Sequence, residues 1–495
     1  MHDHTLDDLL ALIRSRIPLV QIETFEEKRI VDFLGQAAAA EHWDFYLWTA
    51  ADGLTKHPAP TRLGSDPTLQ TALRYLNETI NNGVIALIDV QPHLTDLVSL
   101  RLLKEIAQNY HNNPRTALLI DNRISLPQDL ARLGVRYSPK LPDTDRIHDI
   151  YLEEAYQWLH DKSGDKIIRE GESEAKFLET LRGTTEEDAR LLTKRAIQDG
   201  RIAAGDINQV VEFKRNALAA SGLAEFVEHT ENFESVGGLE HLKTWLQMRR
   251  DAFINDLESV GLTAPKAVLL LGVQGVGKSL VAKAIAGNWG VPLIRLDFGA
   301  LYNKFLGDTE RNLRQVLTQA EAMAPCVLWI DEIEKGLATD AGGVTDGGVS
   351  RRLLGTVLTW MAEHTKKVFM VATSNDISQL PPELIRKGRI DEIFFVDLPG
   401  IITRQSIFRI HLKKRNINTT RLDVRRIAEL SEGFSGSEIE QVIVAALFSA
   451  YAVNRPISTE QILDELKIAK PLSVIMREKV SALRSWASGR TVAAN

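Results

Sequence analysis

The sequence predicts an α/β protein whose parallel sheets lie between layers of helices. Residues 266–290, KAVLLLGVQGVGKSLVAKAIAGNWG, run from an apolar strand through a glycine-rich turn into a helix. Residues 326–335, CVLWIDEIEK, place a fully apolar strand before two carboxylates. Such runs are typical of strands buried on both faces of a parallel sheet. At 495 residues the chain is long enough for about three domains.

Composition narrows the class of protein. A net charge of −7 gives no electrostatic argument for binding nucleic acid or an anionic membrane. A single cysteine, Cys326, excludes an internal disulfide and suits a reducing compartment. The acidic first ten residues do not resemble a signal peptide, and no apolar run approaches the ~20 residues that span a bilayer. We therefore expect a cytoplasmic protein without membrane insertion.

The glycine-rich turn contains a complete G-x-x-x-x-G-K-S sequence between a strand and a helix, which is the context that phosphate binding requires. Its backbone N–H groups can surround phosphates, and the helix N-terminus adds the positive end of its dipole. Lys278 would reach the β- and γ-phosphates, and Ser279 would ligate Mg²⁺. The predicted binding residues are Gly272, Val273, Gln274, Gly275, Val276, Gly277, Lys278, Ser279 and Leu280.

Catalytic side chains are expected at the carboxyl ends of the neighbouring strands, where open α/β sheets bind ligands. Asp331 is suited to hold Mg²⁺ through water, and Glu332 to act as general base. Asn375 ends another apolar strand and could orient the attacking water, although an Asx-turn explains it equally well. Arg386 and Arg389 are either solvated or act as arginine fingers in a neighbouring subunit.

From residue 231 to residue 447, the order of these segments resembles the AAA family of ATPases within the AAA+ class. The resemblance implies ATP and Mg²⁺ as cofactors, and hydrolysis to ADP and phosphate. Where many AAA+ proteins carry a second sensor arginine, this chain has Gly436-Ser437-Glu438. The AAA subgroup also lacks that arginine, so charge stabilisation would rest on the two arginines named above. Further nucleotide-binding residues implied by the resemblance are Val236, Gly237, His411, Gly436 and Ser437.

The sequence LYNKFLGDTERNLR is similar to the family's first pore loop, which Lys304, Phe305, Leu306 and Gly307 would form. In family hexamers this aromatic residue grips a translocating polypeptide, although Phe305 could equally be a core residue at a helix edge. The glycine-rich residues 338–352 predict a mobile loop, the counterpart of the second pore loop. The resemblance therefore implies a homo-oligomer, a hexamer in the family, that acts on a protein client.

The first half repeats this pattern without its chemistry. Residues 17–34 predict strand, turn and helix, but the turn holds three glutamates and no glycine. Residues 44–54 parallel 292–302. Residues 83–90 parallel the strand before Asp331, keeping Asp89 and placing Val90 at the position of Glu332. Asn122 parallels Asn375, and residues 181–197 parallel a helical lid. Like charges would repel a nucleotide here.

We therefore predict a P-loop AAA+ domain with a small helical lid, preceded by a degenerate AAA-like α/β domain, although any α/β domain shows some such repeats. Residues 201–233 predict helix, small-residue break, helix and loop. A helix after Ser458 and another after Pro471 are expected; packing on the lid is favoured over docking of a partner. The expected domains are 1–165 (degenerate α/β), 166–228 (lid-like segment and linker), 229–400 (ATPase core), 401–455 (lid) and 456–495 (C-terminal helices).

The whole arrangement resembles the AAA proteins encoded by cyanobacteria, by other bacteria and by red-algal plastids as a hypothetical chloroplast reading frame. We favour an ATP-driven ring that remodels a protein client. The alternative is an ATP-gated switch or assembly factor whose inactive first half binds a partner without threading. A nucleic-acid-acting protein is not expected, because no basic segment interleaved with aromatic residues is present.

Overall fold

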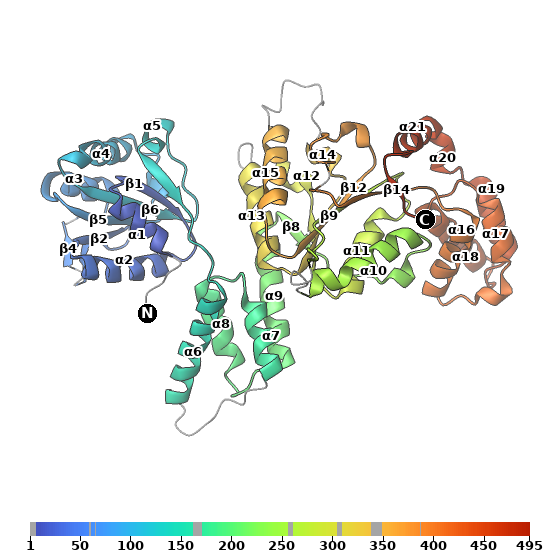
Figure 1. Ribbon diagram of the computed structural model, residues 1–495, viewed down its shortest axis with the longest axis horizontal. Coiled ribbons are helices and arrows are strands. Elements are labelled where there is room, and N and C mark those ends of the chain that lie inside the picture. The colour runs from blue at the N-terminus through green and yellow to red at the C-terminus, as the bar shows by residue number, and fades with distance from the viewer. Residues whose placement is uncertain are drawn as a thin grey trace. The chain divides into compact units, whose positions relative to one another are not determined.

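The computed structural model describes residues 6–58, 61–64, 66–161, 171–255, 261–303, 309–337, 349–386 and 388–495 (Figure 1). The chain divides into two compact units, Met1–Val210 and Val211–Asn495. Within the described residues, each unit contains one seven-stranded sheet. Among these residues no helix combines the length and the apolar character needed to cross a membrane.

The sheet of the first unit has the strand order β4-β3-β2-β5-β6-β1-β7. Strands β2, β5, β6, β1 and β7 run parallel, whereas β3 and β4 extend the edge as an antiparallel hairpin. The bounds are β1 (Leu19–Glu23), β2 (Phe45–Thr49), β3 (Gly53–His57), β4 (Thr61–Leu63), β5 (Gly83–Ile88), β6 (Arg115–Asp121) and β7 (Gly134–Tyr137).

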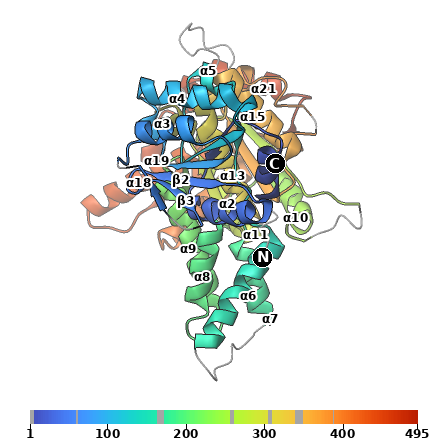
Figure 2. The ribbon, with the colours of Figure 1, turned by 90° about the vertical axis from the view of Figure 1, so that its left-hand side faces the viewer.

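Helices cover both faces of this sheet (Figures 1 and 2). One face packs on α1 (Asp7–Arg14) and α2 (Glu27–Glu41), and the other on α3 (Leu69–Thr79), α4 (Leu97–Gln108) and α5 (Gln128–Ala131). Three helices follow the sheet along the chain, namely α6 (Thr144–Asp161), α7 (Gly171–Leu181) and α8 (Glu186–Ala196). The long apolar runs of β5 and β6 are buried throughout, as strands between two helical layers require.

The sheet of the second unit has the order β14-β13-β9-β12-β11-β10-β8, and among its described strands only β8 runs antiparallel to its neighbour. The bounds are β8 (Ala224–Phe226), β9 (Ala267–Gly272), β10 (Leu293–Leu296), β11 (Cys326–Ile330), β12 (Val368–Ser374), β13 (Glu392–Val396) and β14 (Val492–Ala493). The carboxyl ends of β9, β11 and β12 meet at one edge of the sheet, where the sequence places its polar residues.

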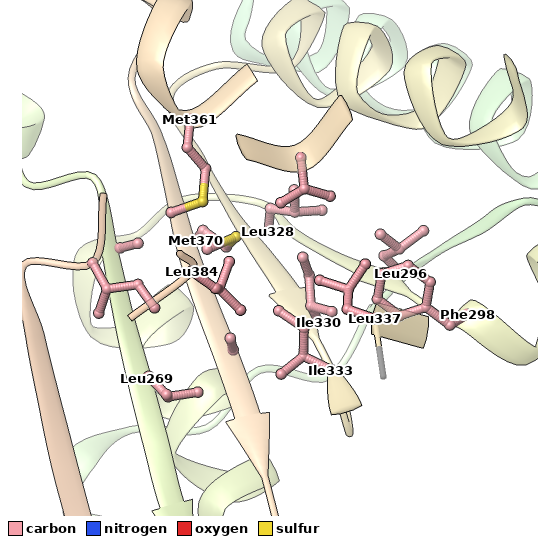
Figure 3. Packing of buried hydrophobic residues seen from close by; sticks show 14 of the residues in the cluster. Leu269, Leu296, Phe298, Leu328, Ile330, Ile333, Leu337, Met361, Met370 and Leu384 are labelled. Atoms are coloured by element: carbon pink, nitrogen blue, oxygen red, sulfur yellow. The ribbon is translucent and has the colours of Figure 1, made fainter. Parts of the chain in front are cut away.

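Two apolar cores enclose this sheet. One face packs on α10 (Glu240–Ile254) and α11 (Lys278–Trp289). The other packs on α12 (Phe298–Asn303), α13 (Thr309–Ala322), α14 (Glu334–Leu337) and α15 (Val349–Glu363). Figure 3 shows how Leu269, Ile330 and Met370 from the strands meet Ile333, Leu337 and Met361 in this second core.

A separate core holds the lid, formed by α16 (Ile401–Lys414), α17 (Val424–Leu430), α18 (Gly436–Ala452) and α19 (Thr459–Ile468). Ser458 caps α19 and forms the predicted capping box with Gln461. The helix after Pro471 is divided into α20 (Leu472–Ile475) and α21 (Arg477–Ala487). Val480 and Leu483 of α21 join the α/β core, so the prediction that this helix packs on the lid was wrong. Its amphipathic pattern shows that one face is buried, but not against which element.

The strand order supports the predicted repeat. In the first unit the parallel strands follow the order β2-β5-β6-β1-β7, and in the second the order β10-β11-β12-β9-β13. In each unit, the parallel strand that comes first in the chain (β1 or β9) lies between the fourth (β6 or β12) and the fifth (β7 or β13). The repeat differs after the second strand, because the hairpin β3–β4 follows β2 whereas a helix follows β10. The parallel between residues 44–54 and 292–302 therefore holds only for the strand.

Two further predictions concern residues 201–233 and residues 338–352. Residues 201–233 were expected to form two helices with a break, but α9 (Ala204–Ser221) is one helix, followed by strand β8. Gly222, with φ of +58°, ends this helix, and a strand takes the place of the predicted second helix. Of the predicted mobile loop, residues 338–348 lie outside the described part of the chain. Arg351 and Arg352 belong to the first turn of α15.

Candidate nucleotide site

The phosphate-binding sequence forms the turn between β9 and α11, as predicted from its glycines. Gly275 and Gly277 have φ of +82° and +101°, a conformation that L side chains rarely adopt. A Cβ atom on Gly275 would lie 2.3 Å from the Ser437 hydroxyl. A glycine is therefore required at this point, both for the turn and for the close approach of the lid.

Lys278 begins α11 and points into the turn. Its Nζ donates to the carbonyl oxygens of Gly272 and Val273 at 2.7 and 2.8 Å, and to Oδ1 of Asn375 at 2.8 Å. Burial lowers the pKa of Lys278 to about 8, although carboxylates including Glu334 oppose the shift. The lysine is thus held by the strand ends at which phosphate oxygens are expected.

Asp331 and Glu332 follow β11 at the same edge. The Thr373 hydroxyl donates to Oδ1 of Asp331 at 2.6 Å and accepts the backbone N–H of Glu332 at 3.0 Å. The Ser279 hydroxyl lies 3.4 Å from the same Asp331 oxygen. A hydroxyl beside a carboxylate suits Mg²⁺, which usually takes one or two protein ligands together with phosphates and waters. These residues fit the predicted metal.

Asn375 joins the lysine to the second carboxylate. Its Nδ2 donates to Oε1 of Glu332 at 2.9 Å, while its Oδ1 accepts from Lys278. Lys335, one turn along from Glu332, forms an ion pair with the Oε2 of that glutamate. Glu332 has φ of +50°, which is uncommon for a residue other than glycine and often marks a functional position.

The predicted residues surround a pocket of about 870 Å³. His411 lies in its wall, 3.5 Å from Glu440, and burial lowers the pKa of this histidine. The N-terminus of α18 closes the pocket on the lid side, since the Ser437 N–H donates to the carbonyl oxygen of Gly275 at 3.1 Å. The predicted residues that line it are Val236, Gly237, Gln274, Gly275, Val276, Gly277, Lys278, Ser279, Leu280, Asp331, Glu332, Asn375, His411, Gly436 and Ser437.

The other predicted residues lie elsewhere. Gly272 and Val273 contribute carbonyl oxygens to Lys278. Arg386 and Arg389 are absent from the described lining of the pocket, and Arg389 donates to the carbonyl oxygen of Glu383 at 2.7 Å. The predicted pore-loop residues Lys304, Phe305, Leu306 and Gly307 lie outside the described residues.

Two residues that form hydrogen bonds to the predicted site residues were not identified from the sequence. Thr373 orients both Asp331 and Glu332, and Glu334 accepts a backbone N–H from Asn375. Thr373 lies two residues before Asn375, and Glu334 lies two residues after Glu332. Only the side-by-side placement of β11 and β12 brings them together, so nothing in the local sequence distinguishes them.

In the first unit, the turn between β1 and α2 takes the place of the phosphate loop. Glu26 lies in this turn with 4% of its surface exposed, and its Oε1 accepts the backbone N–H of Glu186 at 2.6 Å. Its Oε2 accepts from Arg29 at 2.9 Å. Because Glu186 begins α8, a carboxylate of the protein itself lies at the helix N-terminus, a favourable position for an anion.

Further carboxylates gather beside this turn. Burial raises the pKa of Glu27, and the charges of Asp89, Glu187 and Asp121 raise it further. Glu23 is occupied in another way, since its Oε1 accepts the backbone N–H of Ile124 at 3.0 Å. A nucleotide phosphate here would meet several negative charges instead of a ring of free N–H groups.

Strand register relates the two units residue by residue. In the first unit β5 pairs with β6 at Leu87 and Leu119, and in the second β11 pairs with β12 at Ile330 and Ala372. Leu119 and Ala372 each precede the turn asparagine of their strand by three residues. The register therefore places Leu87 at the position of Ile330.

It follows that Ile88 takes the position of Asp331 and that Asp89 takes the position of Glu332. The backbone agrees, because Asp89 has φ of +51° and Glu332 has φ of +50°. The prediction that Val90 replaces Glu332 was wrong by one residue. The first unit thus keeps a carboxylate at the position of the predicted general base, Glu332, but it has an apolar side chain at the position of Asp331, the aspartate predicted to hold Mg²⁺.

Comparisons with known proteins agree with this architecture. Residues 268–398 match the ATPase family associated with various cellular activities (AAA), and residues 5–138 match the N-terminal domain of SpoVK-like AAA ATPases. The chain is 34% identical to the AAA domain-containing protein ycf46 of Trieres chinensis, over 97% of this chain and 96% of that protein. The ycf46 protein of Guillardia theta is 34% identical, over 97% of this chain and 94% of its own.

A more distant relative is the cell division cycle protein 48 homolog of Archaeoglobus fulgidus. It is 31% identical over 54% of this chain and 37% of its own length. The similarity to the ycf46 proteins, by contrast, extends over both units. The chain therefore belongs to the AAA family of ATPases, in the group of AAA domain-containing proteins named ycf46.

Proposed function

We propose that the second unit hydrolyses ATP to ADP and phosphate. The observation that carries this proposal is the continuous hydrogen-bonded network of Lys278, Asn375 and Glu332, with Asp331 and Ser279 beside it. It combines a cation for phosphate oxygens, a carboxylate for the attacking water and a pair of oxygens for Mg²⁺. Asp331, Glu332 and Asn375 follow the carboxyl ends of β11 and β12, and Lys278 and Ser279 begin the helix after β9, so all lie at the edge where this class of sheet binds its ligands.

In this mechanism Lys278 would exchange its carbonyl contacts for the β- and γ-phosphates of ATP. Glu332 would accept a proton from water as the water oxygen attacks the γ-phosphorus and the bond to the bridging oxygen of ADP breaks. Asn375 would hold Glu332 and the water in line. When bound, Mg²⁺ would neutralise charge on the phosphate oxygens, held by Ser279 and, through water, by Asp331.

We further propose that subunits share these sites in a ring, a hexamer in the leading hypothesis, that remodels a protein client. Arg386 and Arg389 support this idea, because they do not line the pocket in the described part of the chain and would need a neighbouring subunit to reach a nucleotide. The domain boundaries, the pore loop around Phe305 and a cytoplasmic location belong to the same proposal. The sequence similarity to a cell division cycle protein 48 homolog is consistent with it.

The test is steady-state phosphate release by the full chain with Mg²⁺ and ATP. We expect hydrolysis by the wild type, loss of ATP binding in Lys278→Ala, and retained binding with roughly a hundredfold or greater loss of turnover in Glu332→Gln. Lys470→Ala, an exposed change in the segment after α19, serves as the matched control and should leave turnover unchanged. A wild-type chain that binds ATP without hydrolysing it would refute the proposed activity.

A further inference from the structure

Glu334 is a buried carboxylate that the mechanism above does not use. Only 5% of its surface is exposed, although its residue type rarely occurs in protein interiors. It begins α14, between Ile333 and Leu337, which are both fully buried in the core shown in Figure 3. Packing on both sides of Glu334 therefore fixes the backbone that carries it.

The contact that Glu334 makes leads to the catalytic network. Its Oε1 accepts the backbone N–H of Asn375 at 2.9 Å. The side chain of the same asparagine contacts Lys278 through Oδ1 and Glu332 through Nδ2. One buried carboxylate thus holds the main chain of the residue that bridges the phosphate-binding lysine and the proposed general base.

Burying the Glu334 carboxylate lowers the stability of the fold, so packing alone does not explain why a glutamate lies here. The Oε2 of Glu334 has no hydrogen-bond partner within the described residues. A buried polar atom left without a hydrogen-bond partner destabilises the folded protein. Burial raises the pKa of Glu334 and the nearby charge of Glu332 raises it further, whereas the hydrogen bond from the Asn375 N–H opposes the shift. An apolar residue would pack at this position at lower cost, but it would not accept the Asn375 N–H.

We propose that Glu334 is a positioning residue for ATP hydrolysis. It fixes the main chain of Asn375, so that the amide of this residue keeps Glu332 and Lys278 in their relative positions. The inference rests on the proposed function, because it assigns Glu334 a part in the same reaction. Glu334 touches neither nucleotide nor water in this account, and it acts on turnover more than on binding.

The experiment measures kcat and KM for ATP, together with the affinity for a fluorescent ADP analogue, in the full chain. Removing the acceptor in Glu334→Ala should lower kcat on the order of ten- to a hundredfold, as for other residues that orient a catalytic group. KM and ADP affinity should change by less than about threefold, because the phosphate loop is untouched. Glu334→Gln keeps an acceptor oxygen and should restore most of kcat.

The controls separate this inference from a general loss of structure. Glu363→Ala, an exposed change at the end of α15, should leave all three values unchanged. If Glu334→Ala does not fold, Glu334→Asp carries the same test, because its shorter side chain withdraws the oxygen from Asn375. A wild-type kcat in these variants overturns the inference while the proposed function stands, and so does an equal fall in ADP affinity and kcat. A wild type without hydrolysis overturns both.

Discussion

At the scale of single residues, the ammonium group of Lys278 is the most strongly perturbed charge of the nucleotide pocket. Only 7% of the lysine is exposed, and carbonyl oxygens and an amide oxygen take all three of its N–H donors. These acceptors are neutral, so they compensate only part of the lost hydration, and burial lowers the pKa of Lys278 to about 8. A triphosphate would favour the charged form.

ATP affinity should therefore fall as the pH rises above about 8, the pKa of Lys278 in the free protein. Below the pKa of about 8 the free protein already carries the Lys278 proton, and phosphates would raise this pKa in the complex. Above that pH, binding must take up a proton, so Kd for a nonhydrolysable ATP analogue should rise by up to about tenfold per pH unit. Fluorescence titrations from about pH 7.5 to 9.5 measure this.

The control for the pH dependence is Lys278→Met, which keeps much of the side-chain volume and removes the titrating group. It should bind weakly and without the same alkaline slope. If the wild type shows a constant Kd across the range, Lys278 does not titrate at the nucleotide site in the way described.

The positions of site residues in the pocket could be predicted from the sequence where a fixed spacing determines them. The phosphate loop, Asp331 and Glu332 are of this kind, because strand, turn and helix follow one another directly. Thr373 and Glu334 are different: their partners lie about forty positions away along the chain, and adjacency of β11 and β12 alone creates the contacts. Such roles depend on sheet register, which the sequence does not state.

At the scale of elements, the lid-like helix α8 of the first unit is held by charge. Glu26 accepts its first backbone N–H, and Arg29 lies between Glu26 and Glu186 at 2.9 and 3.3 Å. Arg190 extends the network, at 2.6 Å from Glu153 and 3.1 Å from Glu154. In the second unit, the corresponding helix α18 instead meets the glycine of the phosphate loop.

Removing the Glu26 carboxylate should loosen α8. Glu26→Ala takes away a charged hydrogen bond to a helix N-terminus and leaves Arg29 with one partner fewer, a change worth roughly 1.5–3 kcal/mol. Hydrogen exchange of a peptide covering residues 184–190 should become about ten- to a hundredfold faster, with or without ATP. Asp129→Ala, which removes an exposed ion pair with Lys104, should not change it. Unchanged exchange in Glu26→Ala would show that the carboxylate does not hold the helix.

Element predictions failed where a local pattern had more than one tertiary outcome. Within residues 201–233, the predicted first helix is α9 and it ends before Gly222, but the next segment forms strand β8 where a second helix was expected. The apolar face of α21 was correctly expected to be buried, but the sequence does not say that it would pack on the α/β core. The Asp89 register was wrong by one because two adjacent apolar-to-acidic alignments look equally good.

At the scale of the whole molecule, five parallel strands follow the same order in both units, but within the described residues only the second unit brings the predicted nucleotide-binding side chains together. The order of the repeats was predictable, since strand, turn and helix recur in sequence. The reason for the missing chemistry was only partly predictable. Three glutamates near one turn predict repulsion of phosphate. The structure shows a second reason, because Glu26 accepts the backbone N–H of Glu186 at the start of α8.

We expect the oligomeric state of the chain to depend on nucleotide. The Glu332→Gln variant with Mg²⁺ and ATP should form particles of about six times the 55.3 kDa chain mass, because trapped ATP would engage Arg386 and Arg389 across a subunit boundary. Single-molecule mass measurement, with a nucleotide-free sample as control, reports the outcome. Particles that stay monomeric or dimeric at micromolar concentration would contradict the ring.

The most direct test of the account is the number of ATP molecules bound per chain. We would measure it by equilibrium dialysis with Glu332→Gln, which prevents turnover, and with the double variant Lys278→Ala, Glu332→Gln. The account predicts one ATP per chain in the first protein and none in the second, because the first unit places a carboxylate where phosphate would bind. A stoichiometry of two, or one ATP remaining after the loss of Lys278, would contradict it.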